Sequence, residues 1–146
     1  MFVLLCVPAF ASVPLAGDEL AVFELVNKER SRNGLAVLEW DDRAARVARD
    51  YSRRMAREGF FSHVDPDGQS VVERAERSKL RGWSSIGENL FACDPTDRAS
   101  SIAIKGWMRS ASHRKNILSR NWLATGIGIA HSRDGKIYIT QVFIDQ

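Results

Sequence analysis

Apolar side chains recur every three or four positions through much of the chain, which is the spacing that gathers them on one face of a helix. In the first such segment, Leu20, Phe23 and Val26 share a face, and Asn33-Gly34 forms a typical helix stop. A second helix is expected to begin after Asp41-Asp42. In all, the pattern predicts four helices, over residues 18–34, 43–59, 69–79 and 95–109.

The period changes to two near the C-terminus, which predicts strands. Ile127 and Ile129 alternate with glycines, residues 133–135 are expected to turn, and residues 136–144 continue as a β-branched and aromatic strand, so the segment predicts a hairpin. Residues 85–92 are the best candidate for a further strand. Since both faces of 136–144 are apolar, helices should cover both sides of the sheet. We therefore predict an α+β fold, a three-layer α-β-α sandwich with a small, mainly antiparallel sheet.

The composition indicates one folded domain with an apolar leader. The chain has 146 residues, of which 45% are hydrophobic and 27% charged, as in ordinary globular domains. Residues 1–16 carry no charge and combine an apolar centre with small residues, which favours a secretory signal peptide or an N-terminal anchor. The domain itself is expected over 18–146. A secreted or cell-envelope protein follows from this interpretation.

The charge distribution and the cysteine content limit which binding partners and which disulfide bonds are expected. The net charge of +3 comes from 21 basic and 18 acidic residues that are interspersed, which argues against nucleic acid as a partner. Because basic residues form stripes on the predicted helices, association with the anionic cell envelope is retained as an alternative. Loss of the leader would leave Cys93 without a disulfide partner, so we expect a half-buried thiol that packs as a small apolar side chain. The domain is expected to be a monomer.

Three segments gather side chains suited to a polar site: FSHVDPDG around His63, IGENLF around Glu88, and WMRSASHRKNIL around Ser110 and His113. Each lies at the end of a predicted element, where side chains from different elements can converge on a cleft. The DPDG stretch suits a type I turn that would hold His63 still. A purely structural, hydrogen-bonding histidine is the simpler interpretation of His63 taken alone.

Glu88 and its neighbour Asn89 stand out because the strand around them is otherwise apolar. A carboxylate there must reach water or find hydrogen-bonding partners. The alternative is a rim position from which Glu88 binds the backbone of a neighbouring loop, and Asn89 is expected to make such bonds in either case.

Together with LVNKERSRNGL, TGIGIA and YITQVF, these segments resemble the CAP superfamily of cysteine-rich secretory, antigen 5 and pathogenesis-related proteins, in its short bacterial form. The resemblance extends from about Leu20 to Phe143. It implies an α-β-α sandwich with an open cleft lined by His63, His113 and the acidic Glu88. Ser110 departs from the pattern, since many eukaryotic relatives carry a second glutamate at this position.

Two neutral imidazoles that meet about 2.0–2.1 Å from a common point suit Zn²⁺. We therefore expect a weak, solvent-open site for Zn²⁺ or another divalent cation at His63 and His113. Glu88 would serve as third ligand or as the acceptor that fixes the tautomer of one ring. Further cleft residues are expected to be Ser110, Arg114, Asn89 and Asp65.

Three functions are compatible with these residues. The resemblance favours a secreted domain that binds a metal, a small lipid or a peptide without catalysis. The alternative is a metal-dependent peptidase or esterase that uses His63, His113 and Glu88, with Glu88 and Ser110 as candidate catalytic residues. A Ser110–His113–Glu88 triad is conceivable, but no G-x-S-x-G turn surrounds the serine. An envelope-binding module ranks third.

Overall fold

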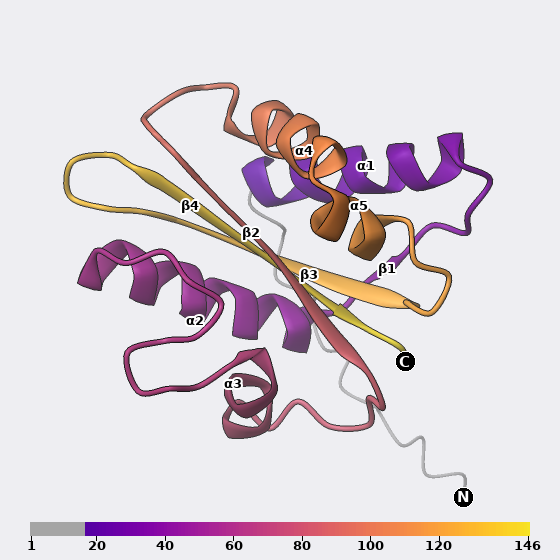
Figure 1. The fold of residues 1–146 in the computed structure, drawn as a ribbon, viewed down its shortest axis with the longest axis horizontal. Coiled ribbons are helices and arrows are strands. Elements are labelled where there is room, and N and C mark those ends of the chain that lie inside the picture. The colour runs from indigo at the N-terminus through magenta and orange to yellow at the C-terminus, as the bar shows by residue number, and fades with distance from the viewer. Residues whose placement is uncertain (1–16) are drawn as a thin grey trace, which may run out of the picture.

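One four-stranded sheet lies between two layers of helices (Figure 1). The computed structural model describes residues 17–146, so the predicted leader at 1–16 lies outside the described residues. In chain order the elements are α1 (Gly17–Arg32), β1 (Glu39–Trp40), α2 (Asp42–Glu58), α3 (Val71–Arg77), β2 (Ile86–Cys93), α4 (Ala99–Arg109), α5 (Ala111–Ile117), β3 (Ala124–His131) and β4 (Ile137–Ile144).

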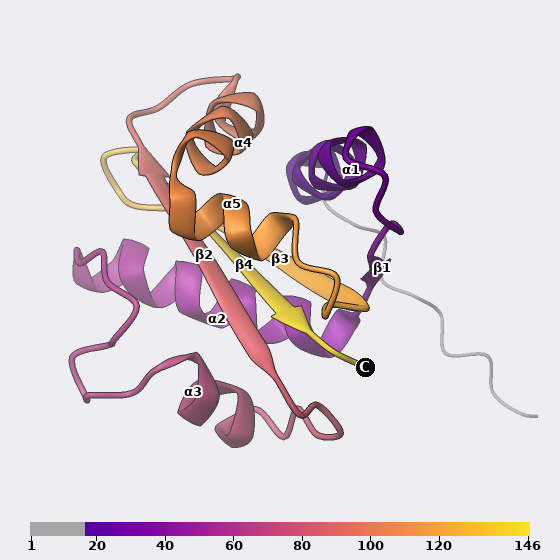
Figure 2. The same ribbon diagram turned by 45° about the vertical axis from the view of Figure 1, so that its right-hand side comes forward.

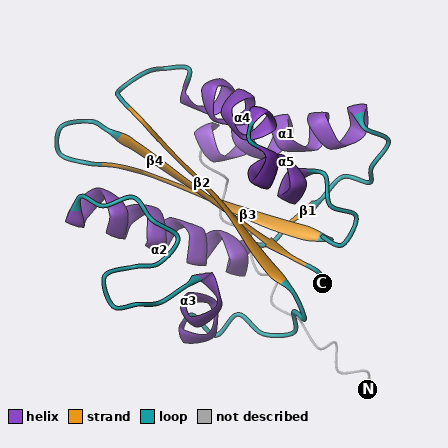
Figure 3. Cartoon of the chain, viewed as in Figure 1, coloured by secondary structure: helices purple, strands orange, loops and turns teal. Residues whose placement is uncertain are grey.

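The sheet has the strand order β1-β3-β4-β2. β4 pairs antiparallel with both β2 and β3, and the short β1 is parallel to β3. Helices α1, α4 and α5 cover one face, whereas α2 and α3 lie on the other (Figure 2). The predicted three-layer α+β sandwich with a mainly antiparallel sheet is therefore confirmed, and Figure 3 shows the alternation of helix, strand and loop along the chain.

The two faces of β4 anchor two separate cores. Ile137, Ile139 and Phe143 pack with α1 and α4. The alternate residues Tyr138, Val142 and Ile144 face α2. This division confirms the expectation from the sequence, because a strand that is apolar on both faces must be covered on both.

Helix α2 lies directly on the main chain of β3. A Cβ atom added to Gly126 would come within 2.0 Å of the Ala45 nitrogen, and one added to Gly128 within 2.1 Å of the Arg49 nitrogen. Ile127, between the two glycines, belongs to the core on the other face of the sheet, and Ile129 packs at the edge of that core. The alternation of glycine and isoleucine thus sets how closely the helix approaches the sheet.

The structure differs from the prediction in three places. α4 begins at Ala99 rather than at residue 95, because residues before it form a local turn in which the Arg98 amide donates to the Thr96 hydroxyl. The two-residue β1 and the seven-residue α5 were not predicted. Both are too short to show a periodic pattern; α5 buries Ile117 alone among its residues.

The helices that frame the candidate site have well-defined ends. Asp41 caps α2 by accepting from two backbone amides, and Gly59, in the left-handed conformation, ends it. α3 starts with a capping box formed by Ser70 and Glu73. These ends fix the loop between α2 and α3. Within residues 17–146, no helix has the length and apolar character needed to cross a membrane.

Candidate functional site

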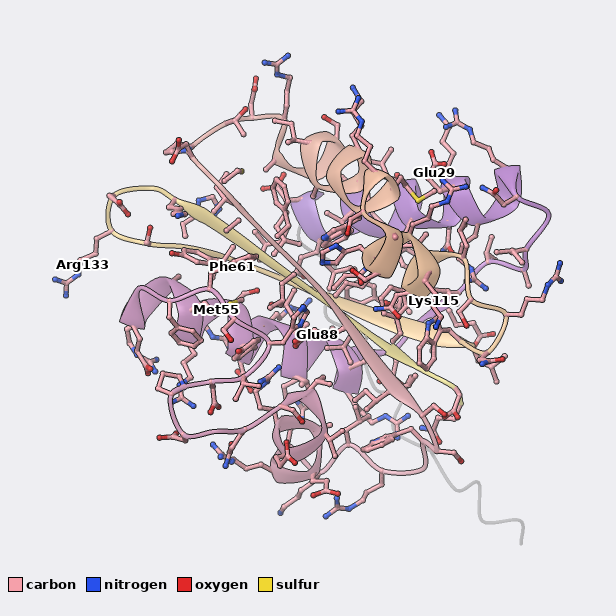
Figure 4. The ribbon with its side chains drawn as sticks, viewed as in Figure 1. Glu29, Met55, Phe61, Glu88, Lys115 and Arg133 are labelled. Atoms are coloured by element: carbon pink, nitrogen blue, oxygen red, sulfur yellow. The ribbon has the colours of Figure 1, made fainter. Side chains whose placement is uncertain are left out.

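Three elements bring the predicted site together. His63 lies in the loop between α2 and α3, and His113 lies on α5. Glu88 lies on β2, near the middle of the molecule (Figure 4). The centroids of the two imidazole rings are 6.5 Å apart and their planes are inclined by 34°. The two histidines, distant in sequence, therefore face the same space, as the sequence predicted.

That space is a cleft of about 370 Å³. One part of its wall is polar, with the two imidazoles, Asn89, Ser112 and Asn116, and the other part is apolar, with Val64, Val71 and Ile86. A larger cavity of about 910 Å³ lies between the end of α2 and the β3–β4 hairpin. Its lining combines charged and uncharged residues and includes His131, but neither of the paired imidazoles.

Glu88 connects one histidine to a buried arginine. Its carboxylate is only 3% exposed, and its Oε1 lies 2.8 Å from Nδ1 of His63. Its Oε2 accepts a hydrogen bond of 2.6 Å from Nη2 of Arg74, which is also buried. The expectation that this carboxylate must find partners is confirmed. Both of its oxygens are engaged, one with the His63 ring and the other with Arg74.

Arg74 was missed by the sequence analysis. It lies on α3 among exposed charged residues of the same helix, and nothing in its local sequence distinguishes it from them. In the structure its Nη1 donates to the main-chain oxygens of His63 (3.1 Å) and Gln69 (2.8 Å). The guanidinium thus contacts the main chain of the loop as well as the Glu88 carboxylate.

The ring of Tyr51, on α2, packs against the guanidinium of Arg74. The guanidinium carbon of Arg74 lies 3.4 Å from the centroid of the tyrosine ring, a cation–π contact. The Tyr51 hydroxyl donates to the main-chain oxygen of Ser62. Burial raises the pKa of Tyr51 to about 12. The loop of His63 is therefore tied to the α2 and α3 layer at several points.

His113 is held differently, by a serine three residues before it. Nδ1 of His113 is 2.7 Å from the hydroxyl of Ser110, the residue at the junction of α4 and α5. The Ser110 side chain makes no capping hydrogen bond to α5. Partial burial and the neighbouring His63 lower the pKa of His113 below its usual value, which favours the neutral imidazole.

Asparagines attach α5 to β2. The side-chain amide of Asn89 donates to the His113 main-chain oxygen (3.2 Å), and Asn116 donates to the Asn89 side-chain oxygen (2.9 Å) and to the Glu88 main-chain oxygen (3.1 Å). Asn89 was expected to bind nearby backbone and does so. It is fully buried, and its contacts set the position of the helix that carries His113.

Three of the four predicted cleft residues, Asp65, Arg114 and Ser110, do not line the cleft. The Asp65 carboxylate is buried in its own turn, where it accepts from the amides of Asp67 and Gln69 and from Arg54. The hydrogen bond from the Gly68 amide to the Asp65 oxygen closes the predicted turn. Arg114 is exposed on α5 and does not line the cleft. Ser110 contacts the ring of His113 but is not a lining residue either, so of the predicted cleft residues Asn89 alone contributes to the lining.

Ser110, His113 and Glu88 do not form a catalytic triad. Ser110 contacts His113, but Glu88 contacts His63, so the carboxylate does not orient the histidine next to the serine. Cys93 is a half-buried free thiol, and burial raises its pKa. That environment fits a packing role rather than a nucleophile.

The donor atoms that remain for a metal are those of the imidazoles. Across residues 17–146, no cluster of three or more His, Cys, Asp or Glu side chains is arranged to hold a metal ion. The hydrogen bonds of the two histidines engage Nδ1 of each ring, which leaves each Nε2 without a protein partner in the described part of the chain. A pair of Nε2 donors fits a cation site completed by solvent or ligand, not a closed structural site.

Comparison with known proteins places these features in a wider group. A family model described as CAP, the cysteine-rich secretory protein family, matches residues 23–143. A protein called an uncharacterized membrane protein, YlbC, from Bacillus subtilis (strain 168) is 36% identical over 87% of this chain. Both matches span the helices and strands that carry the cleft.

Solved structures share the fold. An extracellular protein with an SCP domain from Bacillus anthracis is 33% identical, with a TM-score of 0.77 over 92% of this chain. An outer surface protein from Borrelia burgdorferi superposes with a TM-score of 0.80 at 17% identity, over 92% of this chain and 96% of its own. The chain covers only 34% of YlbC and 45% of the anthracis protein.

Proposed function

The chain belongs to the CAP family of cysteine-rich secretory proteins, and we propose that it is an extracellular binding domain. In this proposal His63 and His113 hold a divalent cation weakly, and the adjoining cleft accepts a small lipid or peptide ligand without catalysis. The extracellular and outer-surface proteins among its structural neighbours support the location.

The orientation of the two imidazoles carries the proposal. Each ring uses Nδ1 for a hydrogen bond inside the protein, to Glu88 or to Ser110, and the rings line one cleft. A histidine that donates from Nδ1 keeps its lone pair on Nε2, which is the form that binds metal. A bound Zn²⁺ would supply positive charge and open coordination positions for an anionic group of the ligand.

The apolar part of the cleft supports a lipid or peptide as the ligand. Val64, Val71 and Ile86 line the wall beside the imidazoles. Val64 is 50% exposed. Clustered exposed apolar side chains at a cleft commonly mark a binding surface. The ligand would therefore combine a polar or anionic group with an apolar part.

A metal-dependent hydrolase remains the alternative. That function needs a carboxylate free to act as base toward a water molecule. Glu88 is the acidic residue of the cleft, and its two oxygens already accept from His63 and Arg74. This arrangement favours binding over hydrolysis. Turnover of peptide or ester substrates that requires Zn²⁺ and is lost in Glu88→Gln would reverse the order of the two proposals.

Calorimetric titration of Zn²⁺ into the purified protein tests the cation site. We expect weak binding that is lost in His63→Ala and in His113→Ala. His131→Ala is the matched control, because His131 is exposed at the far end of β3 and should not affect binding. Equal heats from the parent and all three variants, or no binding by the parent protein, would refute the cation site.

A further inference from the structure

We propose that Arg74 is the positioning residue that makes His63 available as a cation ligand. The inference rests on the proposed function for its consequence, but the contacts that support it exist in the protein without a cation. Arg74 does not line the cleft and would not touch the cation. It acts through Glu88 and through the main chain of the loop.

The Arg74 guanidinium holds His63 at two points, its ring through Glu88 and its main-chain oxygen directly. Nη2 of Arg74 binds the carboxylate that accepts from the His63 ring, and Nη1 binds the main-chain oxygen of His63 itself. The second Nη1 contact, to the Gln69 oxygen, closes the other end of the loop. The Arg74 guanidinium therefore holds both the ring and the main chain of His63.

The environment of His63 explains why these contacts of Arg74 matter. The side chain of His63 is 58% exposed and lies on a loop, so packing does little to restrict its rotamers. Its restraint comes from the buried Glu88 carboxylate, and a buried charged group needs a partner of opposite charge within hydrogen-bonding distance. Arg74 is that partner. Stacking on Tyr51 holds the guanidinium in place.

Arg74 also determines which role Glu88 can play. Because Oε2 is held by Arg74 and Oε1 by Nδ1 of His63, the carboxylate is placed to accept from Nδ1–H, and a cation in the cleft would be held by the imidazoles rather than by Glu88. An ionised acceptor at Nδ1 selects the tautomer with a free lone pair on Nε2. A neutral or displaced residue 88 would not select it as strongly.

The test uses ring ¹⁵N chemical shifts of His63 in the cation-free protein at pH 8, together with Zn²⁺ calorimetry. The variants are Arg74→Met, Glu88→Gln and the double variant, in which no buried charge is left unpaired. Arg77→Met is the control, since Arg77 is an exposed arginine on the same helix. The parent and Arg77→Met should show Nδ1–H for His63. Arg74→Met should show a mixture of the two His63 tautomers. The double variant should show a larger share of the other tautomer than Glu88→Gln does.

Zn²⁺ affinity should fall about 10-fold in Arg74→Met, the lower end of the usual effect of removing a group behind a metal ligand. If Arg74→Met does not fold, the double variant compared with Glu88→Gln gives the same information. Arg74 has no positioning role if the His63 tautomer is unchanged in every variant that folds. If the parent binds no Zn²⁺, the proposed function fails, whereas the ring shifts still decide the role of Arg74.

Discussion

The two histidines of the cleft are held by supports of opposite kinds. His63 is exposed, and its ring is fixed through the buried, charged pair Glu88–Arg74. His113 is half-buried, and its ring is fixed by the neutral hydroxyl of Ser110. The difference shows that an exposed functional side chain can depend on a deeply buried ion pair, whereas a more enclosed one can depend on a local contact.

The supports also differ in their range along the chain. The His63 ring is oriented by a residue 25 positions away. His113 is oriented by a residue three positions away, as the geometry of a helix start allows. The first support should therefore be lost together with the packing of α3 against β2, and the second only with the junction of α4 and α5.

The largest effect on stability should come from Glu88→Ala. This change leaves the Arg74 guanidinium buried without its carboxylate, and breaking a buried pair in this way costs about 3–5 kcal/mol. Glu88→Gln keeps an acceptor and should cost less. Urea denaturation of the full chain measures both. Glu76→Ala, at an exposed carboxylate of α3, is the control and should stay within about 0.5 kcal/mol of the parent. A similar small loss for Glu88→Ala would show that the pair does not support the fold.

Tyr51 should give the second largest effect, at high pH. Its pKa is about 12 in the folded protein against an ordinary value near 10, so the folded state keeps the proton to higher pH than the unfolded state. The resulting stability is complete below pH 10 and is lost as the pH rises toward 12. The two-unit difference corresponds to about 2–3 kcal/mol.

Denaturation of the parent and of Tyr51→Phe between pH 9 and pH 11.5 measures this loss. The parent should lose stability more steeply than the variant, which has no phenol at this position beneath Arg74. Parallel curves would mean that the protonated Tyr51 phenol does not stabilise the His63 side of the site.

The same contrast explains which parts of the site could be predicted from sequence. The histidines and Glu88 stand in short motifs at element ends, and the sheet that assembles them follows from apolar alternation in β4. Arg74 could not be recognised, because its burial depends on how α3 packs on β2 rather than on its neighbours. Asp65 was misplaced for the opposite reason: its turn was predicted, but that turn uses the carboxylate internally.

A smaller effect is expected from Ser110→Ala. The hydroxyl is neutral and does not cap α5, so its removal deletes the hydrogen bond to His113 and a long contact of 3.4 Å with the Ser112 hydroxyl. The loss should be about 1 kcal/mol or less. Urea denaturation beside Glu88→Ala tests the comparison directly. A loss from Ser110→Ala as large as that from Glu88→Ala would remove the distinction between the two supports.

The smallest effect should be the acid response of His113. Its folded pKa is lowered by partial burial and by His63, so the unfolded state takes up a proton first as the pH falls. Stability contributed by the neutral ring is therefore complete above the ordinary pKa of about 6.5 and decreases as the pH falls through that value toward the folded pKa. His113→Gln should flatten the stability curve between pH 7.5 and pH 5.5, a range above the titration of ordinary carboxylates. His63 is present in both proteins, so the difference between the curves isolates His113. A steeper curve in the variant would mean that the folded state prefers the charged ring, which contradicts the enclosed, neutral support assigned to this side of the cleft.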